Sequence, residues 1–211
     1  MASHLRLSLV VGVLVVTAGC AGSLVEVTAS PATIPDSALT LTEYRHQNTT
    51  QVPISYPMGM GGLSQAVTVQ TWLSAYAPET MEETLAVLVV YSSPDVEVAG
   101  ASLNPLAQLS NRELTRFVLE QVAVAQVLGG VSGASGLREV GARNLTVLGS
   151  TAELVSYAGV AEVERQNVSV TINVVSVRHG SDVIVAVGVH QAEESATRTQ
   201  AALARTIEHE G

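Results

Sequence analysis

The last third of the chain alternates between apolar and polar positions in the manner of half-buried β-strands. Strand-like runs cover residues 145–148, 151–163, 168–177 and 183–190, and the polar turns between them are Gly149-Ser150, Arg165-Gln166-Asn167 and His179-Gly180-Ser181. The run 183–190 is apolar or small at nearly every position, which is typical of a strand covered on both faces. This part of the chain therefore predicts an antiparallel meander with helices packed over it.

Earlier residues predict additional strands and one mid-chain helix. A weak strand at 44–56 is interrupted by prolines, a glycine-rich turn follows at 58–63, and better strands lie at 66–76 and 84–91. The spacing of Ser110 and Glu113 is that of a capping box, so a helix begins there and ends near Gly129-Gly130. The glycines that follow predict a flexible loop over 129–141.

Two other helical segments complete the prediction. Residues 35–39 have the composition of one helical turn, and residues 193–208 predict a closing helix whose inner face carries Ala196, Leu203 and Ile207. The expected fold class is α+β: an antiparallel β-sheet meander with a mid-chain helix and a C-terminal helix packed on it.

The N-terminus has the pattern of a lipoprotein signal peptide. An apolar run at residues 5–16, too short to span a bilayer as a helix, is followed by Ala18-Gly19 and by Cys20, the single cysteine of the chain. An ordinary secretory signal with a chance cysteine is the alternative. We expect a signal peptide at 1–19, a lipidated tether at 20–34 and a single α+β domain at 35–211. Lipid attachment at Cys20 would place the domain, after export, on the outer face of the cytoplasmic membrane.

Composition bears on habitat and excludes one class of partner. All ten basic residues are arginine, and 19 acidic residues give a net charge of −9. Such a surface suits molar salt, where its self-repulsion is screened, although a GC-rich genome also replaces lysine with arginine. An acidic chain without a basic stripe does not favour nucleic-acid binding, which depends on clustered Lys and Arg.

The sequence does not indicate that the histidines come together with other reactive residues in a catalytic or metal site. In the turn from His179 to Asp182, adjacent residues cannot form a catalytic triad among themselves, so a polar turn is the simpler interpretation. His190 with Glu193 and Glu194 could supply metal ligands, but their spacing fits no established site, and Glu at a helix start is favoured by the helix dipole. His46 and His209 lie in segments that we expect to be mobile and without partners. The sequence therefore predicts no catalytic residue, no metal site and no cofactor.

Other residue pairs have both a functional and a structural interpretation. The carboxylate pairs Glu82-Glu83 and Glu162/Glu164 could serve general acid–base catalysis, yet a salt-adapted surface produces solvated pairs of this kind. Trp72 and Tyr76 share one face of a strand and are candidates for a ligand platform or for simple packing.

Three sequons make the chain a candidate glycoprotein. The acceptors are Asn48, Asn144 and Asn167, of which Asn167 lies in a predicted turn and is the best placed.

Several short motifs resemble a family of haloarchaeal surface lipoproteins of unknown function. They are Ala29-Ser30-Pro31-Ala32-Thr33, Gln70-Thr71-Trp72 with Tyr76, Asn104-Pro105 before the capped helix, Thr146-Val147-Leu148-Gly149 and Val187-Gly188-Val189. The resemblance implies that the protein is located at a haloarchaeal cell envelope. It does not imply an active site. The order of elements is also similar to the PsbP-like α+β sandwich, whose members are mostly extracytoplasmic binding or assembly factors; this link rests on topology alone.

Together these observations predict a lipid-anchored extracytoplasmic domain, more readily a non-enzymatic binding or assembly factor at the haloarchaeal envelope than an enzyme. Its expected partners are the membrane, through the lipid, and an envelope protein. An envelope hydrolase or metal-dependent enzyme, and a small-ligand receptor, are the alternatives.

Overall fold

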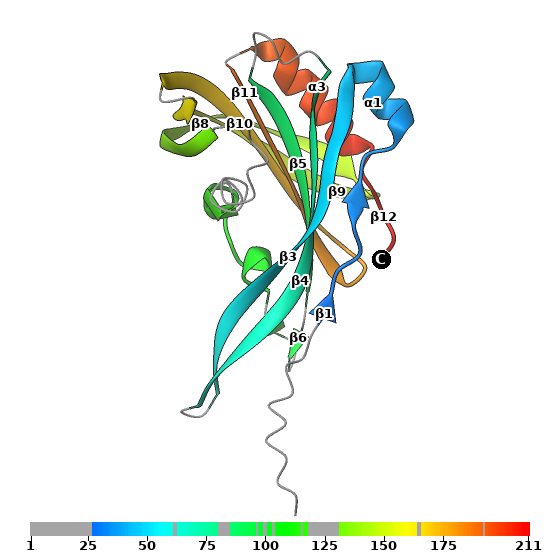
Figure 1. Ribbon diagram of the computed structural model, residues 1–211, viewed down its shortest axis with the longest axis vertical. Coiled ribbons are helices and arrows are strands. Elements are labelled where there is room, and N and C mark those ends of the chain that lie inside the picture. The colour runs from blue at the N-terminus through cyan, green and yellow to red at the C-terminus, as the bar shows by residue number, and fades with distance from the viewer. Residues whose placement is uncertain are drawn as a thin grey trace, which may run out of the picture.

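A computed structural model describes residues 27–60, 63–79, 85–95, 97–98, 101–102, 104–114, 116–117, 131–163, 166–191 and 193–211. Long strands dominate it (Figure 1). The elements are β1 (Val27–Thr28), β2 (Ala32–Thr33), α1 (Asp36–Thr42), β3 (Tyr44–Met60), β4 (Leu63–Pro78), β5 (Ala86–Pro94), β6 (Glu97–Val98), β7 (Ala101–Ser102), a 3₁₀ turn (Pro105–Ala107), β8 (Val131–Val147), β9 (Ser150–Val163), β10 (Gln166–His179), β11 (Asp182–Gln191), α3 (Glu194–Arg205) and β12 (Glu208–His209). Residues 111–114 and 116–117 are also helical.

One eight-stranded sheet organises the molecule. Its order is β1-β4-β5-β11-β10-β9-β8, and β3 pairs with the other edge of β4. All neighbours are antiparallel except β1, which runs parallel to β4 through the pairs Val27↔Val69 and Thr28↔Gln70. The sheet is therefore mixed and mainly antiparallel. The expected fold is confirmed only in its coarser form, a mainly antiparallel sheet accompanied by helices; strands dominate the structure, and the parallel β1 is an addition that the sequence pattern did not predict.

Both faces of the sheet are covered, as the doubly apolar run 183–190 predicted. One face, which we call the α1–α3 face, packs residues such as Ile184 and Ala186 against Leu39 and Leu203 of the two helices. The opposite face, the mid-chain face, packs the alternate residues of β11 against the segment that follows β7, including Leu106 and Leu114. β5 and β11 are consequently buried along nearly their whole length.

The start of the mid-chain helix has the expected cap. The Ser110 hydroxyl accepts a hydrogen bond from the Glu113 backbone N–H, and the Glu113 carboxylate accepts one from the Ser110 backbone N–H at 2.9 Å. This reciprocal pair satisfies two N–H groups at the helix start and confirms the predicted capping box. The hydrogen bonds to Ser110 also lower the pKa of the Glu113 carboxyl. The predicted end of this helix at Gly129-Gly130 lies outside the described residues.

The predicted flexible loop at 129–141 is wrong, because β8 begins at Val131 and pairs with β9 as far as Val147. Three irregularities interrupt the register between 132 and 141, and Gly136 has a positive φ of 65°. Glycines suit such bulges because they lack a Cβ, and bulges hide the alternation by which a strand is recognised in sequence. The tertiary pairing with β9 therefore decides the structure of this segment.

β3 is longer than the predicted strand at 44–56, and the prolines do not break it. Pro53 and Pro57 lie within the strand and face Gln70 and Ala66 of β4. Along the described chain β3 pairs with β4 alone, and an edge strand tolerates proline because only one of its sides carries a ladder. The predicted glycine-rich turn is confirmed in its position, since Met60 pairs with Leu63; residues 61 and 62 lie outside the described part.

The folded part of the chain begins earlier than the expected domain start at residue 35. β1 joins the sheet, and β2 pairs with β12 near the C-terminus. We call residues 27–34 the N-terminal segment. The closing helix is also shorter than predicted, since α3 ends at Arg205 and residues 208–209 form β12. No helix in the described ranges is long and apolar enough to cross a membrane.

Candidate functional site

Two adjoining hollows lie where α1 meets the first residues of β3. The larger has a volume of about 490 Å³ and the smaller of about 310 Å³, and both are lined by Asp36 and His46. We call the two together the α1–β3 groove. Its other lining residues come from the N-terminal segment, α1 and the paired ends of β3 and β4: Thr33, Ile34, Pro35, Leu39, Thr40, Glu43, Tyr44, Arg45, Thr49, Tyr76 and Glu79.

The backbone that forms the groove turns sharply at Glu43. This residue caps the C-terminus of α1 with a φ of 58° and a ψ of 21°, and its N–H bonds to the carbonyl of Leu39. Its own carbonyl accepts a hydrogen bond from the N–H of Glu79 at 3.0 Å, which joins the helix end to the end of β4. A left-handed backbone is unfavourable for a residue with a Cβ, so Glu43 has a conformation that glycine would adopt more readily.

The groove is predominantly acidic. Arg45 forms an ion pair with Glu79 at 2.5 Å, and both side chains are more than half exposed. Asp36 and Glu43 have no ion-pair partner among the described residues. The unpaired charge of the groove is therefore negative, and a cationic or hydrogen-bond-donating group is the complementary ligand.

His46 lies between the two hollows and is not arranged as a catalytic base. Its Nε2 lies 2.7 Å from the Thr49 hydroxyl, and that hydroxyl donates to Ser74 at 3.1 Å. Because the Thr49 proton is directed at Ser74, Nε2 is the donor to Thr49 and cannot accept its proton. The ring also lies against Tyr76, with centroids 5.4 Å apart. The earlier expectation of a mobile His46 without partners is wrong, and the geometry favours binding over nucleophilic chemistry.

Trp72 and Tyr76, the candidate ligand platform, hold the N-terminal segment. The indole Nε1 of Trp72 donates to the carbonyl of Ala29 at 2.9 Å, and the hydroxyl of Tyr76 accepts from the N–H of Ile34 at 2.9 Å. Tyr76 is buried, and burial raises the pKa of its hydroxyl. Of this pair, only Tyr76 lines the α1–β3 groove.

A second cluster joins the two ends of the described chain. His209 Nε2 lies 2.9 Å from the Asp182 carboxylate, and its Nδ1 lies 3.1 Å from His179 Nδ1. The same carboxylate oxygen accepts the N–H of Ser30 at 2.9 Å. His209 and Asp182 are almost completely buried, so the expectation that His209 lacks partners is also wrong. The cluster connects the N-terminal segment, the β10–β11 hairpin and β12 without bringing a nucleophile to either histidine.

His190 belongs to a third polar network, on the α1–α3 face, in which His190, Asn173 and Gln200 are buried. Its Nδ1 faces the carbonyl of Gln191, so Nε2 is the unprotonated nitrogen, which accepts from Thr197 at 2.9 Å and from Asn173 at 3.2 Å. Asn173 also donates to Gln200 at 3.0 Å and accepts from Ser156 at 2.6 Å. Burial lowers the pKa of His190. These contacts use both ring nitrogens in a structural role.

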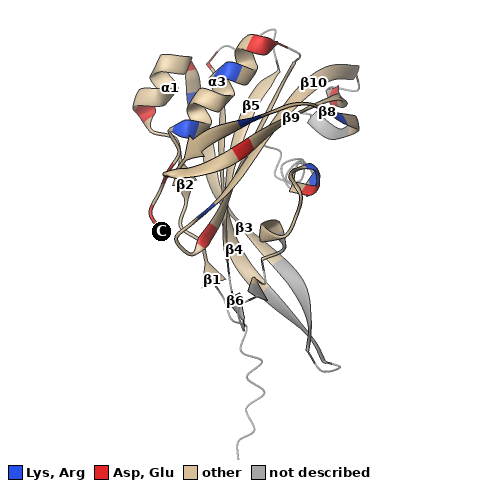
Figure 2. Cartoon of the chain, turned by 180° about the vertical axis from the view of Figure 1, so that it is seen from behind, with Lys and Arg blue, Asp and Glu red and all other residues tan. Residues whose placement is uncertain are grey.

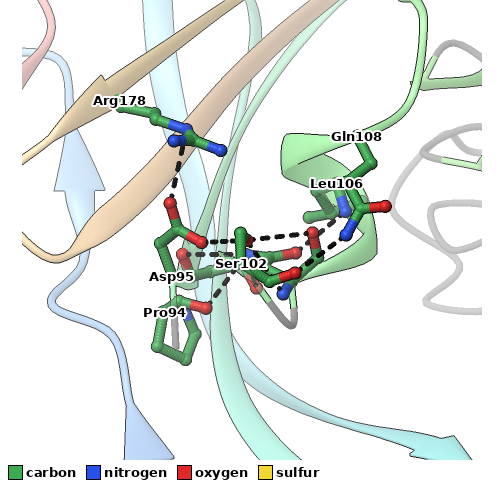
Figure 3. A network of polar contacts seen from close by, with 8 residues as sticks. Pro94, Asp95, Ser102, Leu106, Gln108 and Arg178 are labelled. Carbon is green, nitrogen blue, oxygen red and sulfur yellow. Dashed lines mark hydrogen bonds and ion pairs between the residues drawn. The ribbon is translucent and has the colours of Figure 1, made fainter. Parts of the chain in front are cut away.

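A fourth network fixes the route from β5 to the mid-chain face (Figure 3). The Asn104 amide donates to the carbonyl of Pro94 at 2.9 Å, while its carbonyl oxygen accepts the N–H of Leu106 at 2.9 Å. Asp95 contacts the hydroxyl of Ser102 and pairs with Arg178 at 3.3 Å. The Asn104-Pro105 sequence alone did not reveal that Asn104 makes these hydrogen bonds.

The remaining predicted residues do not converge on a site. Asn48, Asn144 and Asn167 are exposed, and all three lie in strands, so Asn167 is not in the predicted turn. Glu162 is exposed, whereas Cys20, Glu82-Glu83 and Glu164 lie outside the described residues. The described part of the chain contains no group of three His, Cys, Asp or Glu residues positioned to hold a metal ion.

Comparison with known families gives one match. The model of a family described as a domain of unknown function (DUF6517) matches residues 31–208, which include the N-terminal segment from Pro31, the whole α1–β3 groove and α3. No curated protein matches the chain.

Proposed function

The chain belongs to the DUF6517 family, and from this starting point we propose that it is a lipid-anchored, non-enzymatic binding or assembly factor on the outer face of a haloarchaeal membrane. The lipid is attached at Cys20, and the α1–β3 groove receives a basic segment of another envelope protein. As part of the same proposal, the sheet is an antiparallel meander with a mid-chain helix and a C-terminal helix packed on it.

The observation that supports binding is the α1–β3 groove itself. It is an open acidic hollow between α1 and the paired ends of β3 and β4. His46 in this hollow already acts as a hydrogen-bond donor. No hydroxyl in the groove is paired with a free base, so a nucleophilic mechanism has no starting group there. A docked partner would instead meet carboxylates and hydroxyls that are held by rigid elements.

The charge of the groove indicates the partner. Asp36 and Glu43 form no ion pair with any described residue, and Thr33 and Thr40 add hydroxyl acceptors. In molar salt the screening length falls to about 3 Å, so only pairs in direct contact contribute. Arginine side chains of the partner satisfy that condition, because they form short, charge-assisted hydrogen bonds with carboxylates.

Cross-linking with mass spectrometry on intact membranes at native salt tests the proposal. We expect one envelope protein to cross-link next to α1 in the wild type, and the cross-link to be lost in the double variant Asp36→Asn/Glu43→Gln. The matched control is Glu153→Gln/Glu208→Gln, which removes two exposed carboxylates elsewhere and should leave the cross-link unchanged. Equal cross-linking in both variants would contradict the groove as the docking site.

A small-ligand receptor is the second candidate, because the larger hollow has a volume typical of ligand pockets. The same membranes distinguish a receptor from a protein-binding factor. A receptor would be favoured if no protein cross-links and if a small molecule co-purifies with the wild type but not with Asp36→Asn. The envelope-hydrolase alternative depended on His190, whose two ring nitrogens are engaged within a buried network.

A further inference from the structure

The distal half of the β3–β4 hairpin leaves the sheet as a two-stranded ribbon. β5 pairs with β4 only from Trp72 to Tyr76, and β1 pairs with it only at Val69 and Gln70. Residues 63–68 of β4 therefore pair with β3 alone among the described strands. We call residues 55–60 and 63–68 the hairpin arm; Figure 1 shows it projecting from the body beside β1 and β6. An isolated two-stranded ribbon is only marginally stable in water, so a surface that supports it is expected.

The direction of β1 shows where the preceding chain comes from. Because β1 is parallel to β4, the N-terminal end of β1 at Val27 points toward the side on which β4 starts, which is the tip of the hairpin arm. Seven residues separate Cys20 from Val27 and span at most about 25 Å when extended. Six residues separate Leu63 from Val69 and span about 20 Å in a strand. An extended chain thus brings Cys20 to the level of the arm's tip.

The arm lacks charge in a strongly acidic chain. Residues 46–78 contain no Asp, Glu, Lys or Arg, although the whole chain carries a net charge of −9. Figure 2 shows where the charged residues of the described part lie, among them residues on α1 and α3. The sequence near the turn of the arm includes Pro57, Met58, Met60 and Leu63. A charged side chain that docks on lipid loses part of its hydration, which is costly, so this uncharged and Met-containing ribbon is suited to a lipid surface.

We propose that the hairpin arm is a second membrane contact, which docks on the lipid surface to which Cys20 is tethered. The inference rests on the proposed function, since the lipid on Cys20 brings that surface within reach. Two points of attachment orient the domain. Thirteen residues of β4 separate Leu63 from Tyr76, so the α1–β3 groove is held about 43 Å from the arm's tip and faces away from the bilayer.

Labelling of single engineered cysteines tests the arm directly. Ser64→Cys places a thiol on the arm, and Ser37→Cys makes the same chemical change on exposed Ser37 of α1. Each full-length protein is labelled with a polarity-sensitive fluorophore and reconstituted into vesicles of phosphatidylglycerol and phosphatidylcholine in equal parts, with brominated acyl chains as quenchers. We expect the label at position 64 to lose most of its fluorescence to the brominated lipid and the label at position 37 to lose little.

Each outcome has a definite meaning. Equal, weak quenching at the two positions overturns the proposal. A blue-shifted but unquenched label at position 64 also overturns it, because a protein partner then covers the arm. The mass of the Cys20 peptide is measured on the same samples. A lipidated Cys20 with an unquenched position 64 rejects the arm contact alone. An unmodified Cys20 would itself take the fluorophore, so the measurement is then repeated with Cys20→Ser; a quenched position 64 in that variant rejects the anchor and retains the arm contact.

Discussion

Replacing Gly188 with alanine should disrupt the polar network beneath α3. Gly188 lies on β11 directly under the side chain of Gln200, and a Cβ at this position would lie 2.1 Å from Gln200 Oε1 and 2.4 Å from Cδ. Such a separation is far below van der Waals contact, so the Gln200 amide has to move. Gln200 is buried and donates to the carbonyls of Val87 and Val189 at 3.2 and 3.4 Å, while its oxygen accepts from Asn173 at 3.0 Å.

The expected cost follows from these contacts. Three hydrogen bonds with a net value of about 1 kcal/mol each are lost, and a strained rotamer adds about 0.5–1.5 kcal/mol. Gly188→Ala should therefore destabilise the protein by about 3.5–4.5 kcal/mol, a large part of the stability of an ordinary domain. Gln200→Ala removes the same bonds and relieves the clash. The double variant should cost little more than Gln200→Ala alone, which corresponds to a coupling energy of about 4 kcal/mol.

Urea unfolding at constant high salt measures the effect, with Trp72 as the single tryptophan probe. With a slope of about 2 kcal/mol per molar urea, the midpoint of Gly188→Ala should fall by about 2 M. Gly141→Ala is the matched control, because an added Cβ there meets no atom within 4 Å. Its midpoint should stay within about 0.3 M of the wild type. An unchanged midpoint for Gly188→Ala, or additive effects in the double variant, would refute the reasoning.

Three further predictions concern single residues. Glu43→Gly should raise the free energy of unfolding by about 0.5–1 kcal/mol in the same urea assay, because Glu43 has a φ of 58°; a loss of stability would contradict this. The native pKa of His190 is lowered, so its contribution to stability is complete above pH of about 6.5, the unfolded-state pKa, and is lost as pH falls towards the native value; His190→Gln should flatten the pH dependence of the urea midpoint in that range. Asn167→Gln should remove a glycan mass from protein isolated from its native host, and an unmodified wild-type peptide would contradict glycosylation there.

The meander was predictable because its strands are nearly regular. β9, β10 and β11 follow the period-2 pattern closely, and the capping box at Ser110 is a local signal that needs no tertiary context. β8 was missed because its glycines and bulges remove the alternation while the pairing with β9 keeps it a strand. β1 and β2 are two residues each, which is too short for any periodic signal.

The groove could not be predicted because its residues are brought together by tertiary structure. Asp36 and His46 are close in sequence, yet they line the same groove only because Glu43 reverses the chain with a left-handed backbone and β3 then pairs with the distant β4. The partnership of His209 with Asp182 likewise depends on β12 pairing with β2. The charged residues Glu43 and Arg45 were the one sign of the groove in the sequence. Such residues are equally typical of an ordinary solvent-exposed surface.

Under the proposed attachment through Cys20, the parallel pairing of β1 has a mechanical consequence. Tension that enters at Val27 from the side of the hairpin tip acts along the strand axis, while the bonds of β1 to β4 lie across that axis. The load is therefore borne in shear, so that several bonds must break together, and the bonds made by Ala29, Ser30 and Ile34 share it. A pull on the tether is thereby transmitted to the centre of the sheet through many contacts, and the strands are not unzipped one bond at a time.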